Sequence, residues 1–295
     1  MTEAPLIAGV ELGGTKVNCI LASGPDRIED EVRIPTTDPQ ATLAAVEETL
    51  ERWQGFAAIG IASFGPISID HHAGDYGHIT STPKPGWAGT DVARRLARRF
   101  GVPIGFHTDV VGAALAEARW GAGRGIEDLA YVTIGTGVGV GMIAGGKPVD
   151  GLTHAELGHM RPVRFAGDDW IGACPFHGAC VEGLVAGPAI RARTGTAAEE
   201  LPADDPAWDG VAHGIAQLLH TLVLTGVPRR IVIGGGVMSE GHLFPRVRSA
   251  MVASLAGYIQ LPEVAIADTY VVPPQLGGRA GPLGAVVLGM QALAG

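Results

Sequence analysis

Residues 129–141 read Leu-Ala-Tyr-Val-Thr-Ile-Gly-Thr-Gly-Val-Gly-Val-Gly, an apolar run followed by four glycines at alternate positions. The apolar run predicts a buried strand. The glycines predict a tight turn, in which backbone N–H groups and the Thr136 hydroxyl can contact a phosphate. A hairpin with a purely structural role fits the same residues. The spacing is not G-x-G-x-x-G, which gives poor support to a Rossmann dinucleotide site.

Three further stretches join a strand to small turn residues. Residues 6–21 indicate a hairpin around Glu11-Leu-Gly-Gly-Thr15-Lys16, whose turn can face an anion but does not fit a P-loop. Residues 56–62 run into Ser63-Phe-Gly-Pro66, and residues 230–233 run into Gly234-Gly-Gly-Val-Met238. Two of these units lie before residue 70 and two after residue 128, and strands alternate with helices in both parts. The pattern predicts two similar α/β lobes with a ligand cleft between them.

Hydrophobic periodicity and capping residues indicate the other regular elements. Residues 76–87 are too polar and proline-rich for a helix or a strand, and long irregular segments inside compact domains are usually functional loops. Helices are expected at 37–53, 91–100, 110–120, 213–227 and 284–294, and strands at 102–107 and 264–272.

Asp109 stands between the strand at 102–107 and the helix at 110–120. Aspartate is a favoured N-cap, so one interpretation is a structural cap without chemistry. An acid at the carboxyl end of a strand in an open α/β sheet also lies where ligands usually bind. The local sequence leaves both interpretations open.

Composition limits the class of protein. The 295 residues are 46% hydrophobic and 17% charged, which is typical of a folded globular chain. A formal net charge of −9 argues against a nucleic-acid partner, because a phosphate backbone needs a basic surface. We expect no membrane span and no signal peptide, since neither pattern is present. Three cysteines form no disulfide framework, which fits a cytoplasmic protein.

Residues 154–182 contain two of the three cysteines and three of the ten histidines. Cys174-x-x-His177-x-x-Cys180 places three zinc-type ligands in one short loop, and His159 can complete a tetrahedron. Four protein ligands leave no open position, so we expect a structural metal. The alternative is a buried thiol pair with ordinary histidines. His154 receives no role, and its spacing to His159 differs from the H-E-x-x-H of zinc proteases.

Together, in this order, these motifs resemble the ROK family of sugar kinases over nearly the whole chain. Glu11-Leu-Gly-Gly-Thr15 resembles its first phosphate motif, and Ile134–Gly141 resembles the second. Gly234-Gly-Gly-Val-Met238 is similar to the adenosine-side motif. The segment Glu156-Leu-Gly-His159, with the Cys/His loop and Glu182, is similar to the family's sugar and zinc signature.

The resemblance implies a two-lobed α/β architecture, the ribonuclease-H-like or actin-like ATPase fold of the hexokinase and actin superfamily. It implies a small lobe of residues 1–115 with the C-terminal helix 284–295, and a larger lobe of residues 116–283 that carries the zinc loop. The implied activity is ATP-dependent phosphorylation of a hexose, with ATP, Mg²⁺ and structural Zn²⁺. The implied assembly is a homodimer, because family members are commonly dimers.

The resemblance also implies a role for each matched residue. Asp109 is the expected general base, which takes the proton of the sugar hydroxyl. The residues implied in nucleotide binding are Glu11, Gly13, Gly14, Thr15, Lys16, Gly135, Thr136, Gly137, Gly234, Gly235 and Gly236, with Glu11 holding magnesium through water. Those implied in sugar binding are Gly65, Thr108, Glu156, His159 and Glu182. Those implied in zinc binding are His159, Cys174, His177 and Cys180.

Several details favour the bacterial fructokinase branch, and so the conversion of D-fructose to fructose 6-phosphate. The metal loop lacks the C-x-C-G-x-x-G-C of many members. Ser63-Phe-Gly-Pro66, Thr82-Pro-Lys-Pro-Gly-Trp87 and Phe106-His-Thr-Asp109 resemble fructokinases more than glucokinases.

Departures from the family pattern keep other activities open. Glu11 stands where much of the family has aspartate, Val111 near where related kinases often have asparagine, and Thr108 where many have the sugar-binding asparagine. Glucose-type hydroxyl contacts are therefore not carried over intact. The alternatives are a glucose, mannose or N-acetylhexosamine kinase, or a non-catalytic sugar-binding regulator. A DNA-binding repressor of the family would carry a helix-turn-helix ahead of Glu11, where only about ten residues stand.

Overall fold

The computed structural model describes residues 4–239 and 241–295 of the chain. Unit 1 consists of Met1–Gly121, Val149–His154 and Leu276–Gly295, and unit 2 of Ala122–Pro148 and Ala155–Gln275. The expected lobe divisions at 115/116 and 283/284 fall inside two helices that unit 1 contains whole. The signal-peptide expectation concerns an N-terminus whose residues 1–3 lie outside the described residues.

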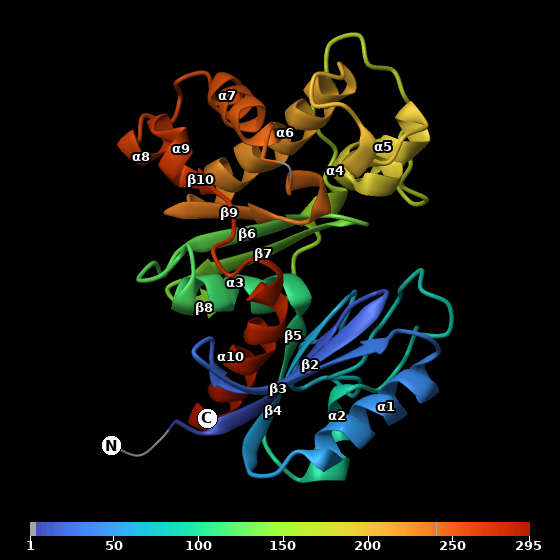
Figure 1. The fold of residues 1–295 in the computed structure, drawn as a ribbon. Coiled ribbons are helices and arrows are strands. Elements are labelled where there is room, and N and C mark those ends of the chain that lie inside the picture. Colours follow the sequence, from blue (N-terminus) through green and yellow to red (C-terminus); the bar gives the residue numbers. More distant parts are fainter. Residues whose placement is uncertain (1–3, 240) are drawn as a thin grey trace. The chain divides into compact units, whose positions relative to one another are not determined.

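Unit 1 is built on a five-stranded mixed sheet with the order β3-β2-β1-β4-β5 (Figure 1). β1, β2 and β3 form an antiparallel meander, whereas β4 and β5 run parallel to β1. The register pairs Leu12 with Ser63 and Ser63 with Thr108, so the three parallel strands end side by side. The strands are β1 (Leu6–Leu12), β2 (Lys16–Gly24), β3 (Arg27–Pro35), β4 (Phe56–Ser63) and β5 (Ile104–Thr108).

Helices cover both faces of this sheet. α1 and α2 bury their apolar residues against one face, and α3 and α10 pack on the other. α10 approaches the strands closely because Gly60 has no side chain: a Cβ there would lie 1.7 Å from the Ala285 carbonyl oxygen. The regular helices are α1 (Pro39–Arg52), α2 (Ala93–Phe100), α3 (Asp109–Trp120) and α10 (Ala280–Ala294), and a 3₁₀ turn, η4 (Gly277–Arg279), precedes α10.

Unit 2 repeats the plan of unit 1. Its sheet has the order β10-β9-β6-β7-β8, in which β6, β7 and β8 are antiparallel and β9 and β10 run parallel to β6 and to each other. The expectation of two similar α/β halves is confirmed by this shared topology. The strands are β6 (Leu129–Ile134), β7 (Val138–Ala144), β8 (Lys147–Pro148), β9 (Arg230–Gly234) and β10 (Val271–Val272).

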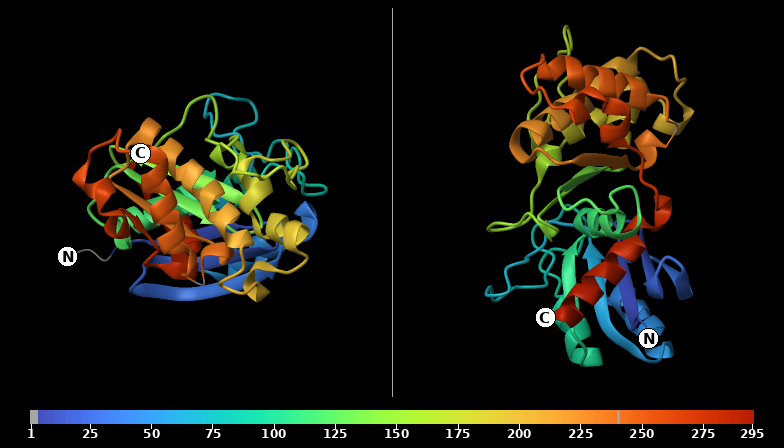
Figure 2. Two further views of the ribbon diagram at one scale, coloured as in Figure 1. Left: turned by 90° about the horizontal axis from the view of Figure 1, so that it is seen from above. Right: turned by 90° about the vertical axis from the view of Figure 1, so that its left-hand side faces the viewer.

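Two long helices of unit 2, α6 and α7, lie on one face of this sheet (Figure 2) and share one core with β6 and β9. α6 begins at Ala207, six residues before the expected start. The helices are α4 (Val181–Val185), α5 (Gly187–Thr194), α6 (Ala207–Gly226), α7 (Leu243–Leu255), α8 (Pro262–Ala265) and α9 (Ala267–Tyr270), with 3₁₀ turns η1 (Leu157–His159), η2 (Ala198–Glu200) and η3 (Gly236–Met238).

The expected strand at 264–272 is wrong except for its last two residues. The segment forms the short helices α8 and α9, and Val271–Val272 alone pair with β9. Pro262 occupies the first turn of α8, a position where proline favours a helix start. Val264 and Tyr270 are buried, whereas Ile266 is 59% exposed. The apolar residues of this segment therefore follow helical packing.

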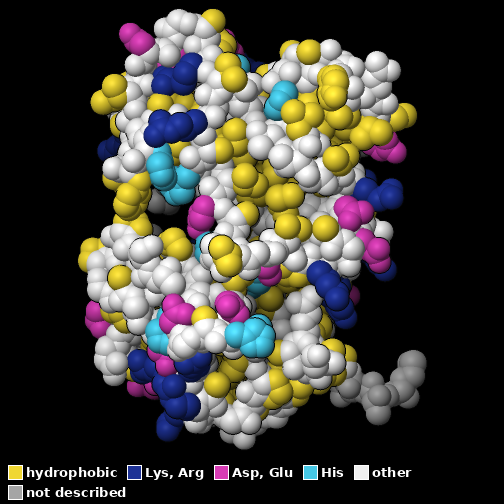
Figure 3. Space-filling model, turned by 180° about the vertical axis from the view of Figure 1, so that it is seen from behind, with side chains coloured by type: hydrophobic (Ala, Val, Ile, Leu, Met, Phe, Trp, Pro, Cys, Tyr) yellow, Lys and Arg dark blue, Asp and Glu magenta, His cyan; other side chains and the backbone are white. Residues whose placement is uncertain are grey.

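On the face in Figure 3, Lys and Arg side chains lie in small groups among apolar and acidic side chains. No helix within the described part of the chain is both long enough and apolar enough to span a membrane.

Candidate functional site

In unit 1, the predicted site residues gather at the carboxyl edge of the parallel strands. The glycine turn 13–15 follows β1, Gly65 follows β4, and Asp109 follows β5. Phe64 N–H donates to the Leu12 carbonyl oxygen at 2.8 Å, which joins the first two strand ends. Ligands of open α/β sheets usually bind at such an edge. The structure thus brings these three predicted positions of unit 1 together.

The first glycine turn is closed by its own backbone and is exposed at its tip. Gly13 N–H donates to the Lys16 carbonyl oxygen at 3.0 Å, and Gly14, Thr15 and Lys16 are exposed. Lys84, from the irregular loop 76–87, donates from Nζ to the Gly14 carbonyl oxygen at 2.5 Å. A lysine charge therefore lies at the turn where the sequence predicts a phosphate.

Glu11 is held at the start of α10. Its Oε2 accepts a hydrogen bond from the Asn18 side-chain amide on β2. A Cβ at Gly281 would lie 1.8 Å from Glu11 Oε1, so the missing side chain of Gly281 makes room for this carboxylate. Burial raises the pKa of Glu11, although the Asn18 hydrogen bond and the charges of Lys16 and Arg33 oppose that rise.

Asp109 is not the N-cap of α3. The N-cap is Thr108, whose Oγ1 accepts from Val111 N–H at 3.3 Å, and Asp109 is the first helical residue. The capping interpretation of Asp109 is therefore wrong. Asp109 Oδ1 accepts from Val110 N–H at 2.8 Å, which orients the carboxylate at the strand end. Thr108 is only 4% exposed and its hydroxyl caps the helix.

A buried histidine precedes these two residues. His107 is 5% exposed, and its Nδ1 accepts from Thr108 N–H at 2.8 Å. A nitrogen that accepts carries no proton, so the proton of the neutral ring is on Nε2. Nε2 lies 3.0 Å from Asp150 Oδ1, where it donates a hydrogen bond. His107 and Asp150 thereby join the end of β5 to the segment Val149–His154.

In unit 2, the two other glycine motifs also lie at one sheet edge. Thr133 on β6 pairs with Gly234 on β9 in parallel register, so Gly135 and Gly235 follow neighbouring strand ends. A Cβ at Gly235 would lie 2.3 Å from the Ile134 carbonyl oxygen. Thr136, Gly235 and Gly236 are exposed. The hairpin that contains Gly135–Gly137 is therefore open to a ligand at its tip.

Glu182 joins the metal-type loop to this hairpin. Its Oε2 accepts from the backbone N–H of Val138 at 3.0 Å, and a Cβ at Gly137 would lie 2.8 Å from the same oxygen. Its Oε1 is 3.9 Å from His159 Nδ1. Gly158, next to His159, packs against Val138 so closely that a Cβ would lie 2.0 Å from the Val138 carbonyl oxygen.

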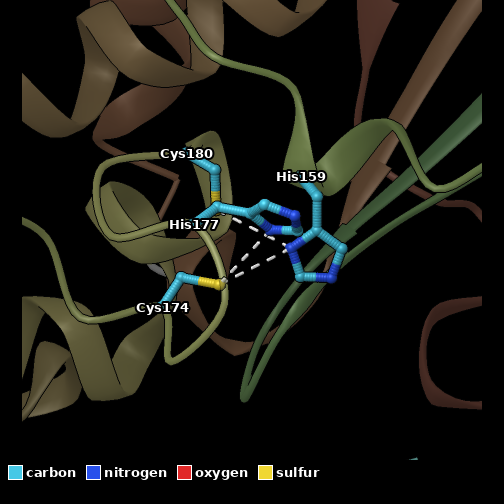
Figure 4. A group of neighbouring side chains, drawn as sticks. All are labelled: His159, Cys174, His177 and Cys180. Atoms are coloured by element: carbon cyan, nitrogen blue, oxygen red, sulfur yellow. Dashed lines mark hydrogen bonds between the residues drawn. The ribbon is translucent and has the colours of Figure 1, made fainter. Parts of the chain in front are cut away.

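The four predicted metal ligands converge on one point (Figure 4). One ligand atom from each of His159, Cys174, His177 and Cys180 lies within 4.8 Å of all the others. His159 Nδ1 is 3.8 Å from Cys174 Sγ and 3.7 Å from Cys180 Sγ, and His177 Nδ1 is 3.8 Å from Cys174 Sγ. Neighbouring ligand atoms of a tetrahedral zinc site are separated by roughly 3.5–3.8 Å. The quartet therefore fits a tetrahedral cation.

Short backbone elements fix the ligands of this quartet. Cys174 and Gly178 form an isolated bridge that closes the loop, and Cys180 is the N-cap of α4, where its Sγ accepts from Gly183 N–H at 3.4 Å. Burial raises the pKa of the Cys180 thiol to about 11, and the Cys174 thiol acts in the same direction. A bound cation would instead favour the thiolate.

Three residues with clear contacts at the unit 1 edge carry no predicted role: Asn18, Lys84 and His107. His154, which the sequence left without a role, is 5% exposed and contacts Gly65 and Ile67. Lys84 could have been found, because it lies in the irregular loop that predicts function. Asn18 and His107 had no local signal, because their partners, Glu11 and Asp150, are set by strand pairing and by a distant segment.

The fold and the site together describe two α/β units. Each unit has a glycine hairpin at the carboxyl edge of its parallel strands, and the second unit also has the Cys/His quartet. Residues 7–292 match the model of the ROK family, and the chain belongs to that family. The ROK hexokinase of Thermus thermophilus has the same fold, with a TM-score of 0.81 and 28% identity over 98% of this chain and 99% of that one. The actin-like ATPase fold class is confirmed.

Two bacterial enzymes show higher sequence similarity. The fructokinase of Pediococcus pentosaceus is 42% identical over 288 residues, which cover 98% of this chain and 99% of that protein. The fructokinase of Zymomonas mobilis is 41% identical over 291 residues, 96% of each chain.

Proposed function

We propose that this protein is an ATP-dependent fructokinase, which transfers the γ-phosphoryl group of ATP to D-fructose and forms fructose 6-phosphate. The observation that carries the proposal is its full-length similarity to fructokinases at 41–42% identity, against 28% for the ROK hexokinase. The site supports the reaction class. Phosphoryl transfer depends mainly on positioning and charge neutralisation, which glycine turns and a well-placed carboxylate provide.

In unit 1, Asp109 is the proposed general base. It takes the proton of the sugar hydroxyl while that oxygen forms a bond to the γ-phosphorus and the bond from phosphorus to the ADP oxygen breaks. The hydrogen bond from Val110 N–H orients Asp109. The turn Gly13-Gly14-Thr15 with Lys16 contacts phosphate oxygens, and Lys84 brings a further positive charge to that turn. Gly65 and Thr108 are the proposed sugar contacts of this unit.

Glu11 is the proposed ligand of a magnesium ion in unit 1. Its carboxylate is held by Asn18 beside the first glycine turn, and oxygen ligands of this kind suit magnesium, directly or through water. When bound, Mg²⁺ neutralises charge on the β- and γ-phosphate oxygens.

In unit 2, Gly135, Thr136 and Gly137 are the proposed second phosphate contact, and Gly234, Gly235 and Gly236 are the proposed adenosine contact. The exposed positions of Thr136, Gly235 and Gly236 at one sheet edge support both assignments. Glu156, His159 and Glu182 are the proposed sugar contacts of this unit, because carboxylates accept hydrogen bonds from polyols.

The Cys/His quartet is proposed to hold a structural zinc ion. Two thiolates and two imidazoles form a preferred zinc donor set, and the four side chains leave no position for water. His159 would bind the ion through Nδ1, the nitrogen that faces both cysteines. Its other nitrogen then remains for a sugar hydroxyl.

The decisive experiment is a coupled ADP-release assay with fructose, glucose, mannose, N-acetylglucosamine and N-acetylmannosamine. We expect the highest kcat/KM for fructose, with product identified as the 6-phosphate by ³¹P NMR. A higher kcat/KM for another hexose would assign the chain to a different ROK kinase activity. Absence of ADP release with every sugar, together with sugar binding in calorimetry, would support a non-catalytic sugar-binding role.

Assembly and location are proposed by analogy with the family: a homodimer in the cytoplasm. Light scattering coupled to size-exclusion chromatography tests the dimer. A mass near 30.3 kDa, that of a single chain, would contradict it.

A further inference from the structure

The segment Val149–His154 belongs to unit 1, although the chain on both sides of it belongs to unit 2. It contains no helix or strand. Three of its side chains instead attach it to the strand ends of unit 1. Asp150 accepts from His107 at the end of β5, and Thr153 and His154 both bind Ile67, shortly after β4.

His154 forms the most buried of these contacts. Its ring is 5% exposed, and Nε2 accepts from the backbone N–H of Ile67 at 3.0 Å. A backbone N–H can only donate, so Nε2 is unprotonated and the proton of the neutral ring is on Nδ1. Thr153 Oγ1 lies 3.4 Å from the Ile67 carbonyl oxygen, as a weaker donor. Two consecutive residues therefore bind both polar backbone groups of Ile67.

The same ring packs on Gly65. A Cβ at Gly65 would lie 3.3 Å from His154 Cε1 and 3.5 Å from its Nε2, so the imidazole lies directly over this glycine. Beyond the turn, the Ile67 side chain is 1% exposed in the core of unit 1, and Thr80 N–H donates to the Pro66 carbonyl oxygen at 2.8 Å. Thr80 therefore holds the turn 65–67 through a hydrogen bond to Pro66, and His154 holds it through a hydrogen bond from Ile67.

We propose that His154 is a positioning residue for the sugar: it fixes the turn 65–67, and with it the distance between the sugar contact at Gly65 and the base Asp109. The register supports this role, because Ser63 and Thr108 are paired residues and the turn and the base follow them directly. The inference rests on the proposed function, since it gives Gly65 a sugar to contact.

The two histidines that attach this segment have opposite hydrogen-bonding roles. His107 donates from Nε2 to Asp150, whereas His154 accepts at Nε2 from Ile67. The segment is therefore held at its two ends by one donor and one acceptor imidazole, next to the ends of β5 and β4. Losing the acceptor at His154 should loosen the turn 65–67 while the attachment at His107 remains.

The test compares His154→Leu with His154→Gln. Leucine fills a similar volume but accepts no hydrogen bond, whereas the Gln Oε1 can take the place of Nε2. An exposed histidine of the same unit, His72, provides the control His72→Ala. The readouts are hydrogen exchange of the Ile67 amide by NMR, and kcat and KM for fructose and for ATP.

For His154→Leu we expect at least about tenfold faster exchange of the Ile67 amide and about a tenfold higher KM for fructose. The KM for ATP should stay within about twofold. His154→Gln should restore both the amide protection and the KM for fructose, and His72→Ala should match the wild type. Unchanged exchange and KM in His154→Leu would overturn the proposal, as would a normal KM despite a fast-exchanging Ile67.

If His154→Leu does not fold, His154→Gln alone decides: a folded Gln variant with a protected Ile67 amide and a raised KM for fructose contradicts the proposal, and wild-type values for both support it. If the wild type releases ADP with another hexose instead of fructose, the proposed function fails separately. The KM comparison is then made with that hexose, and the exchange at Ile67 is measured unchanged.

Discussion

Glu182 accepts a hydrogen bond from the backbone N–H of Val138 at 3.0 Å, through the oxygen that also lies against Gly137. Its other oxygen is 3.9 Å from His159 Nδ1, one of the four atoms of the Cys/His quartet. The metal-type loop and the second glycine hairpin of unit 2 therefore share one carboxylate. Disturbing the loop should disturb the hairpin.

The first prediction concerns this carboxylate. Glu182→Ala leaves the Val138 N–H without its acceptor, so the hairpin should loosen and ATP should bind about tenfold more weakly, as expected for one hydrogen bond. Glu182→Gln keeps an oxygen that can accept from Val138 and should retain most of the nucleotide affinity. Calorimetry with a non-hydrolysable ATP analogue measures the affinity, and hydrogen exchange of the Val138 amide measures the hairpin. Equal affinities for both variants would contradict the prediction.

A second prediction tests the general base. Asp109→Asn keeps an Oδ1 that can accept from Val110 N–H, so the helix start should be preserved. The amide cannot take the sugar proton, and kcat should fall by about 10²–10⁴-fold or more. ATP affinity should remain at the wild-type value. Turnover near the wild-type rate in this variant would rule out Asp109 as the base.

The quartet leads to a third prediction. Purified protein should contain about one zinc ion per chain by inductively coupled plasma mass spectrometry. His177→Ala should lose that ion and lower the melting temperature by at least about 5 °C, because a four-ligand site contributes directly to folding. His213→Ala, a change in the same unit at a ring that contacts the Val163 carbonyl oxygen, is the control and should retain zinc. His159→Ala should lose zinc and also raise the KM for sugar.

Two results would contradict the proposed zinc site or the two roles proposed for His159. Wild-type protein without zinc, prepared without chelators, would favour a plain thiol pair. A His159→Ala variant that has lost its metal but binds sugar normally would separate the two roles proposed for this ring.

The fourth prediction is a pH dependence at Glu11. Burial raises the pKa of this carboxyl above its ordinary value of 4.5. The folded chain then holds the proton more tightly than the unfolded chain, so this contribution to stability is fully present below pH 4.5 and is lost as the pH rises through the raised value. Glu11→Gln does not titrate. Its melting temperature relative to the wild type should therefore increase between pH 4.5 and pH 7.

Scanning calorimetry of both proteins without nucleotide, at constant ionic strength, measures this difference. A difference that is constant with pH would show that the Glu11 pKa is unshifted. A difference that decreases would mean that the folded state favours the carboxylate, for example because the Asn18 hydrogen bond outweighs burial.

Much of the fold follows from local sequence. The run 129–134 is a strand with the expected bounds, and 39–52 is a helix that Asp38 caps. Both could be predicted because the hydrophobic periodicity of a strand or a helix depends only on neighbouring residues. The segment 262–270 shows the limit. The sequence predicted a strand at 264–272, but packing of Val264 and Tyr270 in the core of unit 2 favours two short helices.

The candidate site divides in the same way. The sequence by itself determined the chemical groups: the glycine hairpins, the acid after β5 and the four zinc-type ligands, whose spacing is local or nearly so. Tertiary structure alone decided which of their atoms meet. Glu182 binds Val138 across 44 residues, and His154 binds Ile67 across 87. Such contacts depend on strand register and chain crossing, which no short stretch of sequence encodes.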